Sequence, residues 1–426
     1  MTHSCGTSNG LRGIVEMPGD KSISHRALMI ASLARGRSVI RGLSLAAAPI
    51  STINCLRSLG VQIVENNGET IVQGKGLFGF APPTSNLDAG NSATSMRLLA
   101  GILAGQRFEV TLVGDDSLQR RPMERVAIPL RLMGAEIALT ESGTAPMSIR
   151  GGRKLTGIEY SLPVPSAQVK SAILFAGLGA EGESTVREKV QSRDHTERML
   201  GLETRREGSF FCTSIRRGNE PVAKEFHIPG DVSSATFFIV AALITRNSEL
   251  TIRNVGVNPT RTEFIDVLRK VGASIEIQNQ RTIAGEAVAD LSIRSSELHG
   301  DISLEGDSIP RLVDEIPILA VAAMFTRGTF TVRNAKELRL KESDRATALV
   351  RNLRTLGNEV EEYEDGFAFQ SRKMNIGCEI DSFGDHRIAM AFGIAGLAIG
   401  GVRIRDAECV SISFPEYWEV LKRLSN

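Results

Sequence analysis

One pattern of apolar and polar positions recurs along the whole chain. In each copy, a short apolar strand leads to a Ser, Asn or Asp, then to an Ala-rich apolar helix, a turn and a β-branched strand. Side chains of those polar types accept hydrogen bonds from the free N–H groups of a first helical turn, so they predict where helices begin. The six predicted starts lie near Ser22, Asn91, Ser166, Ser233, Asp314 and Asp385.

The segments that follow these helices are also alike. Strands are predicted at residues 38–41, 185–187, 250–253, 329–333 and 402–405. A second helix in several copies ends in a Leu-rich turn closed by glycine, which suits the left-handed residue after a helix. These glycines are Gly60, Gly134, Gly272 and Gly357. Residues 61–72 alternate around Asn66-Asn67-Gly68, as a hairpin does. The pattern predicts a βαβαββ unit of roughly 70 residues, used six times.

Two near-identical segments separate the first three units from the last three. Residues 18–22 read Pro-Gly-Asp-Lys-Ser and residues 229–233 read Pro-Gly-Asp-Val-Ser. Pro-Gly breaks regular structure, so the pair predicts an interdomain hinge. We predict an α/β (α+β) fold with two domains of three repeats each. The first comprises residues 20–229 and the second residues 1–19 plus 230–426. The last helix has no hairpin of its own, so we expect the N-terminal strand around 11–17 to complete the second domain and not the first.

Composition narrows the possible functions. A chain of 426 residues exceeds the size at which one core stops growing, about 250–300 residues. Lys plus Arg number 50 and Asp plus Glu 49, which argues against nonspecific binding of nucleic acid or an acidic membrane. Five widely spaced cysteines without C-x-x-C spacing argue against disulfides and a zinc site. No export signal or spanning segment is visible, so we expect a cytoplasmic protein, and we expect it to be a monomer.

Basic side chains gather near the predicted helix starts. They are Lys21, Arg26, Arg97, Lys341, Arg345 and Arg387. A helix N-terminus presents unpaired N–H groups and the positive end of the helix dipole. A cleft can therefore be strongly cationic although the net charge is only +1. The sequence predicts binding sites for small anions, with domain closure around them.

Residues 18–29, Pro-Gly-Asp-Lys-Ser-Ile-Ser-His-Arg-Ala-Leu-Met, resemble the signature of the 5-enolpyruvylshikimate-3-phosphate synthase family. Further motifs follow in the family's order: Gly90 to Arg97, Arg121-Pro122-Met123, Ser166-Ala167-Gln168, Ser192-Arg193-Asp194, Asp314-Glu315, Leu340 to Arg345, Gly384 to Arg387 and Ser413-Phe414-Pro415. The resemblance implies two inside-out α/β barrel domains and no cofactor or metal. It implies transfer of the enolpyruvyl (carboxyvinyl) group of phosphoenolpyruvate to the 5-hydroxyl of shikimate 3-phosphate, with release of phosphate, in the shikimate pathway to chorismate and the aromatic amino acids.

The resemblance also implies roles for individual residues. Catalysis would fall to Asp314 as base, Glu342 as the proton carrier at C3 of phosphoenolpyruvate, and Lys21 between the substrates. Shikimate 3-phosphate would be bound by Lys21, Ser22, Arg26, Ser166, Ala167, Gln168, Ser192, Arg193, Asp314 and Lys341. Phosphoenolpyruvate would be bound by Lys21, Asn91, Ala93, Arg121, Gln168, Glu342, Arg345 and Arg387. Arginine suits both substrates because its fork donates two parallel hydrogen bonds.

Three positions depart from the common family pattern. Ala93 stands where many members carry Gly, which resembles the glyphosate-insensitive branch, and residues 166–170 and 192–197 also fit that branch. Ile412 replaces a Lys of the sensitive branch, which removes one phosphate contact. Residues 46–48 are three alanines where an acidic pair is usual, so the helix that follows has a weaker start.

Two other functions remain open at this point. A transferase that acts on UDP-N-acetylglucosamine shares the fold, but it uses a loop cysteine where Asp116 stands here. A noncatalytic ligand-binding or RNA-processing protein of the same repeats would need no general base, whereas Asp314 and Glu342 are present. We expect His25 and His386 to be structural, and the role of His195 is open.

Overall fold

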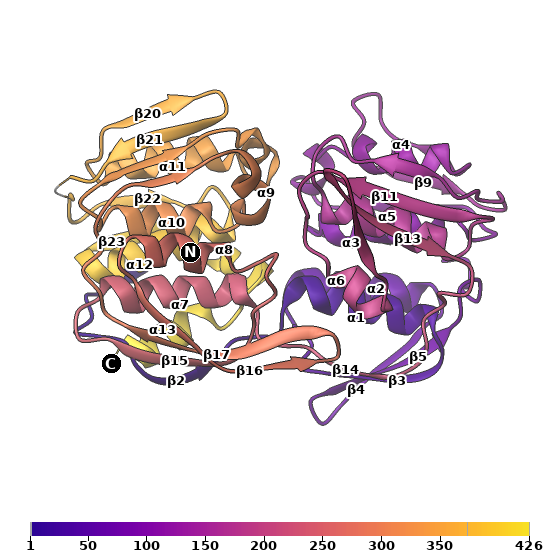
Figure 1. Ribbon diagram of the computed structural model, residues 1–426, viewed down its shortest axis with the longest axis horizontal. Coiled ribbons are helices and arrows are strands. Elements are labelled where there is room, and N and C mark those ends of the chain that lie inside the picture. The colour runs from indigo at the N-terminus through magenta and orange to yellow at the C-terminus, as the bar shows by residue number, and fades with distance from the viewer. Residues whose placement is uncertain (1, 373, 426) are drawn as a thin grey trace. The chain divides into compact units, whose positions relative to one another are not determined.

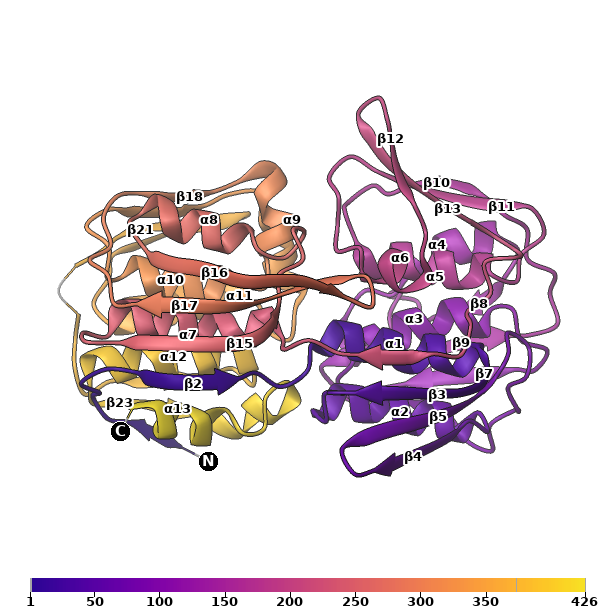
Figure 2. The ribbon, with the colours of Figure 1, turned by 60° about the horizontal axis from the view of Figure 1, so that its bottom comes forward.

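The computed structural model describes residues 2–372 and 374–425, and it divides into two compact units. Unit 1 comprises Met1–Pro18, Pro229–Thr282 and Ala287–Asn426, and unit 2 comprises Gly19–Ile228 and Ile283–Glu286. Six sheets formed by the described residues are distributed three to each unit. In both units the strands lie outside and apolar helices lie inside, as Figures 1 and 2 show. This mixed α/β, inside-out arrangement confirms the predicted fold class.

The three sheets of unit 2 share one strand pattern. The first has the order β14-β3-β5-β4, the second β6-β7-β9-β8 and the third β10-β11-β13-β12. In each, the first pair is parallel and the other pairs are antiparallel, as a βαβαββ unit requires. The strands are β3 (Arg35–Arg41), β4 (Gln62–Asn66), β5 (Glu69–Lys75), β6 (Leu87–Asp88), β7 (Val110–Val113), β8 (Glu136–Ala138), β9 (Met147–Arg150), β10 (Glu159–Ser161), β11 (Glu183–Glu188), β12 (Thr204–Glu207), β13 (Phe210–Arg216) and β14 (Glu225–His227).

Three helices fill the interior of unit 2. They are α1 (Lys21–Leu33), α3 (Ala93–Leu103) and α5 (Ala167–Gly177), and nearly every residue after their first turns is buried. Helices of that kind are apolar all round because they pack on every side. The second helix of each repeat is α2 (Ala47–Ser58), α4 (Glu124–Leu132) or α6 (His195–Leu200). As expected from the three alanines, α2 begins at Ala46 without a side-chain cap.

Unit 1 repeats this plan with one variation. Its sheets have the orders β16-β17-β15-β2, β18-β19-β21-β20 and β1-β23-β22. The N-terminal strand β2 pairs in parallel with β15, and β1 takes the antiparallel place beside β23 that a hairpin strand takes elsewhere. The strands are β1 (His3–Cys5), β2 (Arg12–Glu16), β15 (Glu249–Gly256), β16 (Ser274–Ile283), β17 (Glu286–Arg294), β18 (Ile302–Leu304), β19 (Thr329–Val332), β20 (Val360–Tyr363), β21 (Gly366–Gln370), β22 (Glu379–Asp381) and β23 (Val402–Arg405).

The helices of unit 1 also fall into an inner and an outer set. The inner set is α7 (Val232–Ile244), α10 (Ile316–Ala323) and α12 (His386–Ile399), which are buried almost throughout. The outer set is α8 (Glu263–Lys270), α9 (Ile309–Leu312), α11 (Arg345–Thr355) and α13 (Tyr417–Ser425). No helix of the described residues has the length and apolar character that a membrane span needs.

The helix starts agree with the predicted positions to within two residues, but several capping residues differ. The caps of α1, α3 and α7 are Asp20, Ser92 and Asp231, each one or two residues from the predicted residue. The α10 helix begins after Glu315 without a side-chain cap. The four turn glycines all have positive φ, between 82° at Gly60 and 100° at Gly134, which explains why glycine is needed there.

Candidate functional site

The segment around Pro18 and Gly19, where the chain first passes from unit 1 to unit 2, fixes the position of Lys21. Gly19 passes so close to Gly42 that an added Cβ would lie 1.8 Å from the Gly42 carbonyl oxygen. Asp20 then caps α1 by accepting a hydrogen bond of 2.9 Å from the Ile23 amide. Lys21 is therefore the first helical residue, and like Ser22 it is only half-buried. The backbone holds the ammonium at a helix N-terminus, where anions bind.

Arg26 is buried and connects three helices of unit 2. Its Nε donates to Thr196 Oγ1 at 2.7 Å, and its terminal nitrogens donate to Ser171 Oγ at 2.9 Å and to the Ser22 carbonyl at 3.0 Å. Burial lowers the pKa of Arg26 to about 10, so the side chain remains charged at neutral pH. The arginine therefore holds the start of α1 against α5 and α6.

Arg121 and Asn91 lie together before α3 and α4. Arg121 donates to Asn91 Oδ1 at 3.1 Å and to Ser117 Oγ at 3.3 Å. Asn91 in turn donates to Asp115 at 2.7 Å. Two predicted phosphoenolpyruvate contacts thus share one hydrogen-bonded group, and Ala93 follows as the first residue of α3.

Arg97 is a residue whose part the sequence reasoning left unassigned. It donates to Gln168 Oε1 at 2.6 Å and to the Pro122 carbonyl at 2.8 Å. Gln168 also donates to Thr94 Oγ1 at 3.0 Å. Arg97 therefore orients the predicted contact Gln168 and the segment that carries Arg121. In the sequence, the position of Arg97 at the end of the motif 90–97 was the one feature that could have indicated this role.

The third repeat supplies the remaining predicted residues of unit 2. Ser166 caps α5 by accepting from the Val169 amide at 3.4 Å, so Ala167 and Gln168 form the first turn. Ser192 is buried, and its hydroxyl donates to Glu188 Oε2 at 2.7 Å. Arg193 follows and is half-buried. Polar side chains of the predicted site thus lie at or near the N-termini of α1, α3 and α5.

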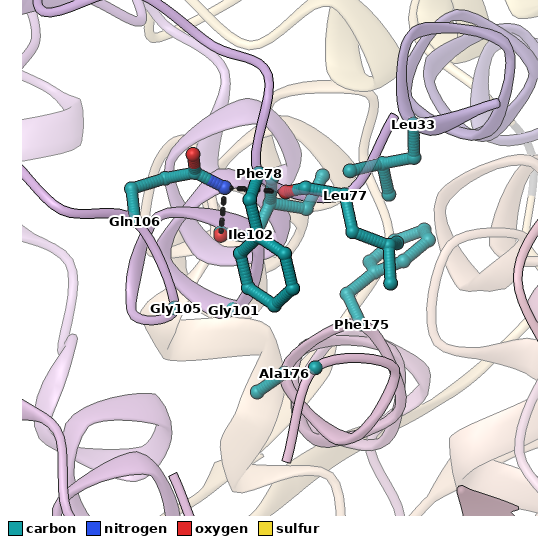
Figure 3. Close-up of a pocket in the computed structure, with 10 residues that line it drawn as sticks. Leu33, Leu77, Phe78, Gly101, Ile102, Gly105, Gln106, Phe175 and Ala176 are labelled. Carbon is teal, nitrogen blue, oxygen red and sulfur yellow. Dashed lines mark hydrogen bonds between the residues drawn. The ribbon is translucent and has the colours of Figure 1, made fainter. Parts of the chain in front are cut away.

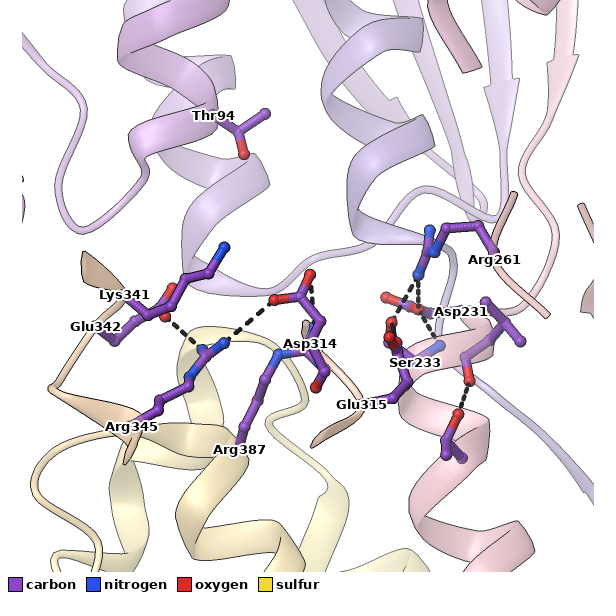
Figure 4. Close-up of polar contacts among 12 residues, drawn as sticks. Thr94, Asp231, Ser233, Arg261, Asp314, Glu315, Lys341, Glu342, Arg345 and Arg387 are labelled. Carbon is purple, nitrogen blue, oxygen red and sulfur yellow. Dashed lines mark hydrogen bonds and ion pairs between the residues drawn. The ribbon is translucent and has the colours of Figure 1, made fainter. Parts of the chain in front are cut away.

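In unit 1, Arg345 is surrounded by carboxylates (Figure 4). Its guanidinium, 1% exposed, donates to Asp314 at 3.2 Å and to Asp385 at 2.8 Å, and it also contacts Glu342. Burial alone would lower the pKa of Arg345, but Asp385, Glu342 and Asp314 raise it well above its ordinary value. The arginine stays charged and holds the two predicted catalytic carboxylates in fixed places.

Asp385 was predicted from the sequence as a helix start, which is confirmed, but not as a residue that orients the site. It is fully buried, and it caps α12 by accepting from the Arg387 amide at 2.9 Å while also accepting from Arg345. Arg387 donates to the Asp314 carbonyl at 2.9 Å. Asp385 thus holds the guanidinium of Arg345 and the backbone turn from which Arg387 extends, and the motif 384–387 was the signal that could have revealed it.

Lys341 belongs to the same group of unit 1. Its side chain is 22% exposed, and its Nζ lies 3.8 Å from Glu337 Oε1. Burial lowers the pKa of Lys341, while Asp314 and Glu337 oppose that shift. Unit 1 therefore brings five predicted residues into one group: Asp314, Lys341, Glu342, Arg345 and Arg387.

Two histidines left outside the predicted site are buried and hydrogen-bonded. His25 Nδ1 lies 2.7 Å from Thr52 Oγ1, and Thr52 lies 2.7 Å from Ser95 Oγ, which links α1, α2 and α3. Burial lowers the pKa of His25 to about 3, so it is neutral and structural. His195 Nδ1 lies 2.7 Å from Glu286.

A small apolar pocket in unit 2 lies apart from these groups (Figure 3). Leu33, Leu77, Phe78 and Phe175 are among its lining residues, and Gln106 donates to the Leu77 carbonyl at 2.7 Å. None of the predicted site residues lines it. With a largely apolar lining it has no groups to bind two small anions.

Buried arginines, a lysine at a helix N-terminus and carboxylates held by ion pairs are typical of enzymes that act on small anions. The comparisons identify that class. The family model for EPSP synthase (3-phosphoshikimate 1-carboxyvinyltransferase) matches residues 6–421. The chain belongs to this family and is a carboxyvinyl (enolpyruvyl) transferase.

Individual relatives agree with the family match. The 3-phosphoshikimate 1-carboxyvinyltransferase of Geobacter metallireducens is 49% identical over 424 residues, 98% of each chain. The solved structure of EPSP synthase from Acinetobacter baumannii matches this chain with a TM-score of 0.86 and 42% identity, and the match covers 100% of this chain and 98% of that one. The enolpyruvyl transferase NikO from Streptomyces tendae has a TM-score of 0.76 at 16% identity, covering 99% and 96%, and shows the shared fold alone.

Proposed function

We propose that this chain transfers the enolpyruvyl group of phosphoenolpyruvate to the 5-hydroxyl of shikimate 3-phosphate and releases phosphate. Relatives matched over nearly the full length carry this activity in their names. The observation that carries the proposal within the structure is the Arg345 group, where one buried cation fixes Asp314 and Glu342. A protein that only bound a ligand would not need two fixed carboxylates of this kind.

The chemistry requires proton transfers at two atoms, the 5-hydroxyl oxygen of shikimate 3-phosphate and C3 of phosphoenolpyruvate. The 5-hydroxyl oxygen adds to C2 of phosphoenolpyruvate while C3 gains a proton, and the tetrahedral intermediate then loses phosphate and a C3 proton. We assign removal of the hydroxyl proton to Asp314 and the two transfers at C3 to Glu342. Lys21, at the N-terminus of α1, acts as acid and stabilises the charge that develops between the substrates.

The remaining residues bind the substrate anions. We assign the 3-phosphate to Ser166, Ala167, Gln168, Ser192, Arg193 and Lys341, and the shikimate carboxylate to Ser22 and Arg26. Phosphoenolpyruvate is assigned to Lys21, Asn91, Ala93, Arg121, Gln168, Glu342, Arg345 and Arg387. Support comes from the hydrogen bonds that already hold Arg121 to Asn91 and Arg97 to Gln168. Of all the assigned residues, Asp314, Lys341, Glu342, Arg345 and Arg387 belong to unit 1 and the others to unit 2.

Ala93 carries a finer proposal on inhibitor sensitivity. It is the first residue of α3 and is 6% exposed, beside Asn91 of the proposed phosphoenolpyruvate group. A methyl group there narrows the space beside that substrate. We expect micromolar glyphosate to leave activity largely intact, and Ala93→Gly to make the enzyme sensitive. Inhibition of the unmodified enzyme at those concentrations would contradict the proposal.

The activity is tested by phosphate release. We expect release with phosphoenolpyruvate plus shikimate 3-phosphate, and none with phosphoenolpyruvate plus UDP-N-acetylglucosamine. Glu342→Gln should lose most turnover, whereas Glu159→Gln, at an exposed ion pair with Arg187, serves as the control. Turnover of the nucleotide sugar would refute the assignment. We further propose that the enzyme acts as a monomer in the cytoplasm, which gel filtration and cell fractionation test.

A further inference from the structure

A lysine and two glutamates form a buried triad next to the proposed phosphate-binding residues. Lys170 in α5 is 1% exposed, and its Nζ lies 2.5 Å from Glu188 Oε1 and 2.7 Å from Glu197 Oε1. Glu188 ends β11 and Glu197 lies in α6, so three elements of the third repeat meet at one ammonium. Burial alone would lower the pKa of Lys170, but Glu197 and Glu188 raise it above its ordinary value. The lysine therefore stays charged.

Packing does not account for such a triad. Removing each ion from water costs several kcal/mol, and well-packed apolar side chains often give equal or greater stability. Both glutamate side chains are only 3% exposed, so all three groups carry that cost. A role beyond stability is therefore indicated, and the hydrogen bonds around the triad show where it acts.

One side of the triad holds Ser192. The Ser192 hydroxyl donates to Glu188 Oε2 at 2.7 Å, and Lys170 Nζ lies 3.4 Å from the Ser192 carbonyl oxygen. A serine hydroxyl has one proton to donate, and here Glu188 accepts it. If a phosphate oxygen accepts that proton instead, Glu188 keeps its hydrogen bond from Lys170. The ammonium thus prevents the cost of leaving a buried carboxylate unpaired when the hydroxyl turns.

The other side of the triad supports Arg26. Thr196, next to Glu197, accepts from Arg26 Nε at 2.7 Å and lies 2.7 Å from Ser171 Oγ. Ser171 directly follows Lys170, so the ion pair between Lys170 and Glu197 joins α5 to α6 where Arg26 is bound. Lys170 is therefore connected to two of the proposed contacts to shikimate 3-phosphate: to Ser192 through Glu188, and to Arg26 through the elements that bind it.

We propose that Glu188 and Lys170 are positioning residues for phosphate recognition: Glu188 orients the Ser192 hydroxyl, and Lys170 holds Glu188 while that hydroxyl turns to the substrate. Neither side chain touches the substrate. The inference rests on the proposed assignment of Ser192 to the 3-phosphate. It adds a mechanism by which a buried group sets the affinity for a phosphorylated substrate.

A double-mutant cycle tests the coupling. The variants are Ser192→Ala, Glu188→Gln and their combination, with Glu159→Gln as the matched control in the same sheet. Losing a hydrogen bond to a charged group weakens binding by roughly tenfold or more, so Ser192→Ala should raise the KM for shikimate 3-phosphate by about that factor. Glu188→Gln removes the carboxylate that competes with phosphate for the Ser192 proton, so it should lower that KM. The KM for phosphoenolpyruvate should stay within twofold. Because Glu188 acts through Ser192, Glu188→Gln should have no further effect in the Ser192→Ala background.

A second measurement separates positioning from general damage. Shikimate, which lacks the phosphate, should compete equally well in the unmodified enzyme and in Glu188→Gln. Lys170→Met leaves Glu188 dependent on the Ser192 proton, so it should raise the KM for shikimate 3-phosphate, and if it does not fold, Glu188→Gln alone decides. An effect of Glu188→Gln that persists in the Ser192→Ala background, or an equal change in shikimate binding, would overturn the inference. An unchanged KM in Ser192→Ala alone would instead show that the phosphate assignment itself is wrong.

Discussion

Protonation of His25 should destabilise unit 2 as the pH falls. The ring is fully buried beside Thr52, and burial together with the nearby charges of Lys21 and Arg26 lowers its pKa to about 3. In the unfolded chain a histidine titrates near pH 6.5. The unfolded state therefore binds a proton that the folded state does not, so stability is fully present above pH 6.5 and is lost progressively down to pH 3.

The size of the effect follows from these two values. Each pH unit within that window changes the free energy of unfolding by about 1.4 kcal/mol, because one proton is involved. Between pH 7 and pH 5 the loss from His25 is about 2 kcal/mol. Other groups also titrate in this range, so the contribution of His25 is the part of the pH dependence of the unfolding free energy that is absent in His25→Asn. His227→Asn is the control, since that ring is half exposed.

Hydrogen exchange of the α1 amides in increasing urea is the assay. Trp418, the one tryptophan in the chain, lies in unit 1, so its fluorescence does not report on His25 directly. The stability difference between the unmodified protein and His25→Asn should shrink by about 2 kcal/mol between pH 7 and pH 5. A difference that is the same at both pH values would refute the view that His25 is held neutral.

Two further predictions concern the residues that orient the site. Asp385→Asn should lower kcat/KM by about 100-fold or more in the phosphate-release assay, because buried Arg345 loses a charged partner and the start of α12, which carries Arg387, loses its charged cap; a loss below tenfold would contradict this role. Arg97→Lys should raise the KM for phosphoenolpyruvate by roughly tenfold, since a lysine cannot reach both Gln168 and the Pro122 carbonyl, whereas Arg187→Lys should leave it unchanged.

Local sequence rules were sufficient for the repeat. The glycines Gly60 and Gly134 and the hairpin around Asn66-Asn67-Gly68 depend on positive φ values, which only a few residue types adopt easily. The recurring polar residues located the starts of the six inner helices to within two residues. The exact capping residues were less predictable, because other residues able to cap a helix lie close by: Ser22 two residues after Asp20, and Asn91 directly before Ser92.

The sequence by itself determined the repeating unit, its fold class and, through ordered motifs, the family. Only the tertiary structure decided which polar side chains face one another. Asp385 and Arg345 are 40 residues apart in the chain, and Arg97 and Gln168 are 71 apart, yet each pair is hydrogen-bonded. The physical reason is that backbone preferences act over a few residues, whereas burying a charged group requires a partner that another part of the fold must bring to it.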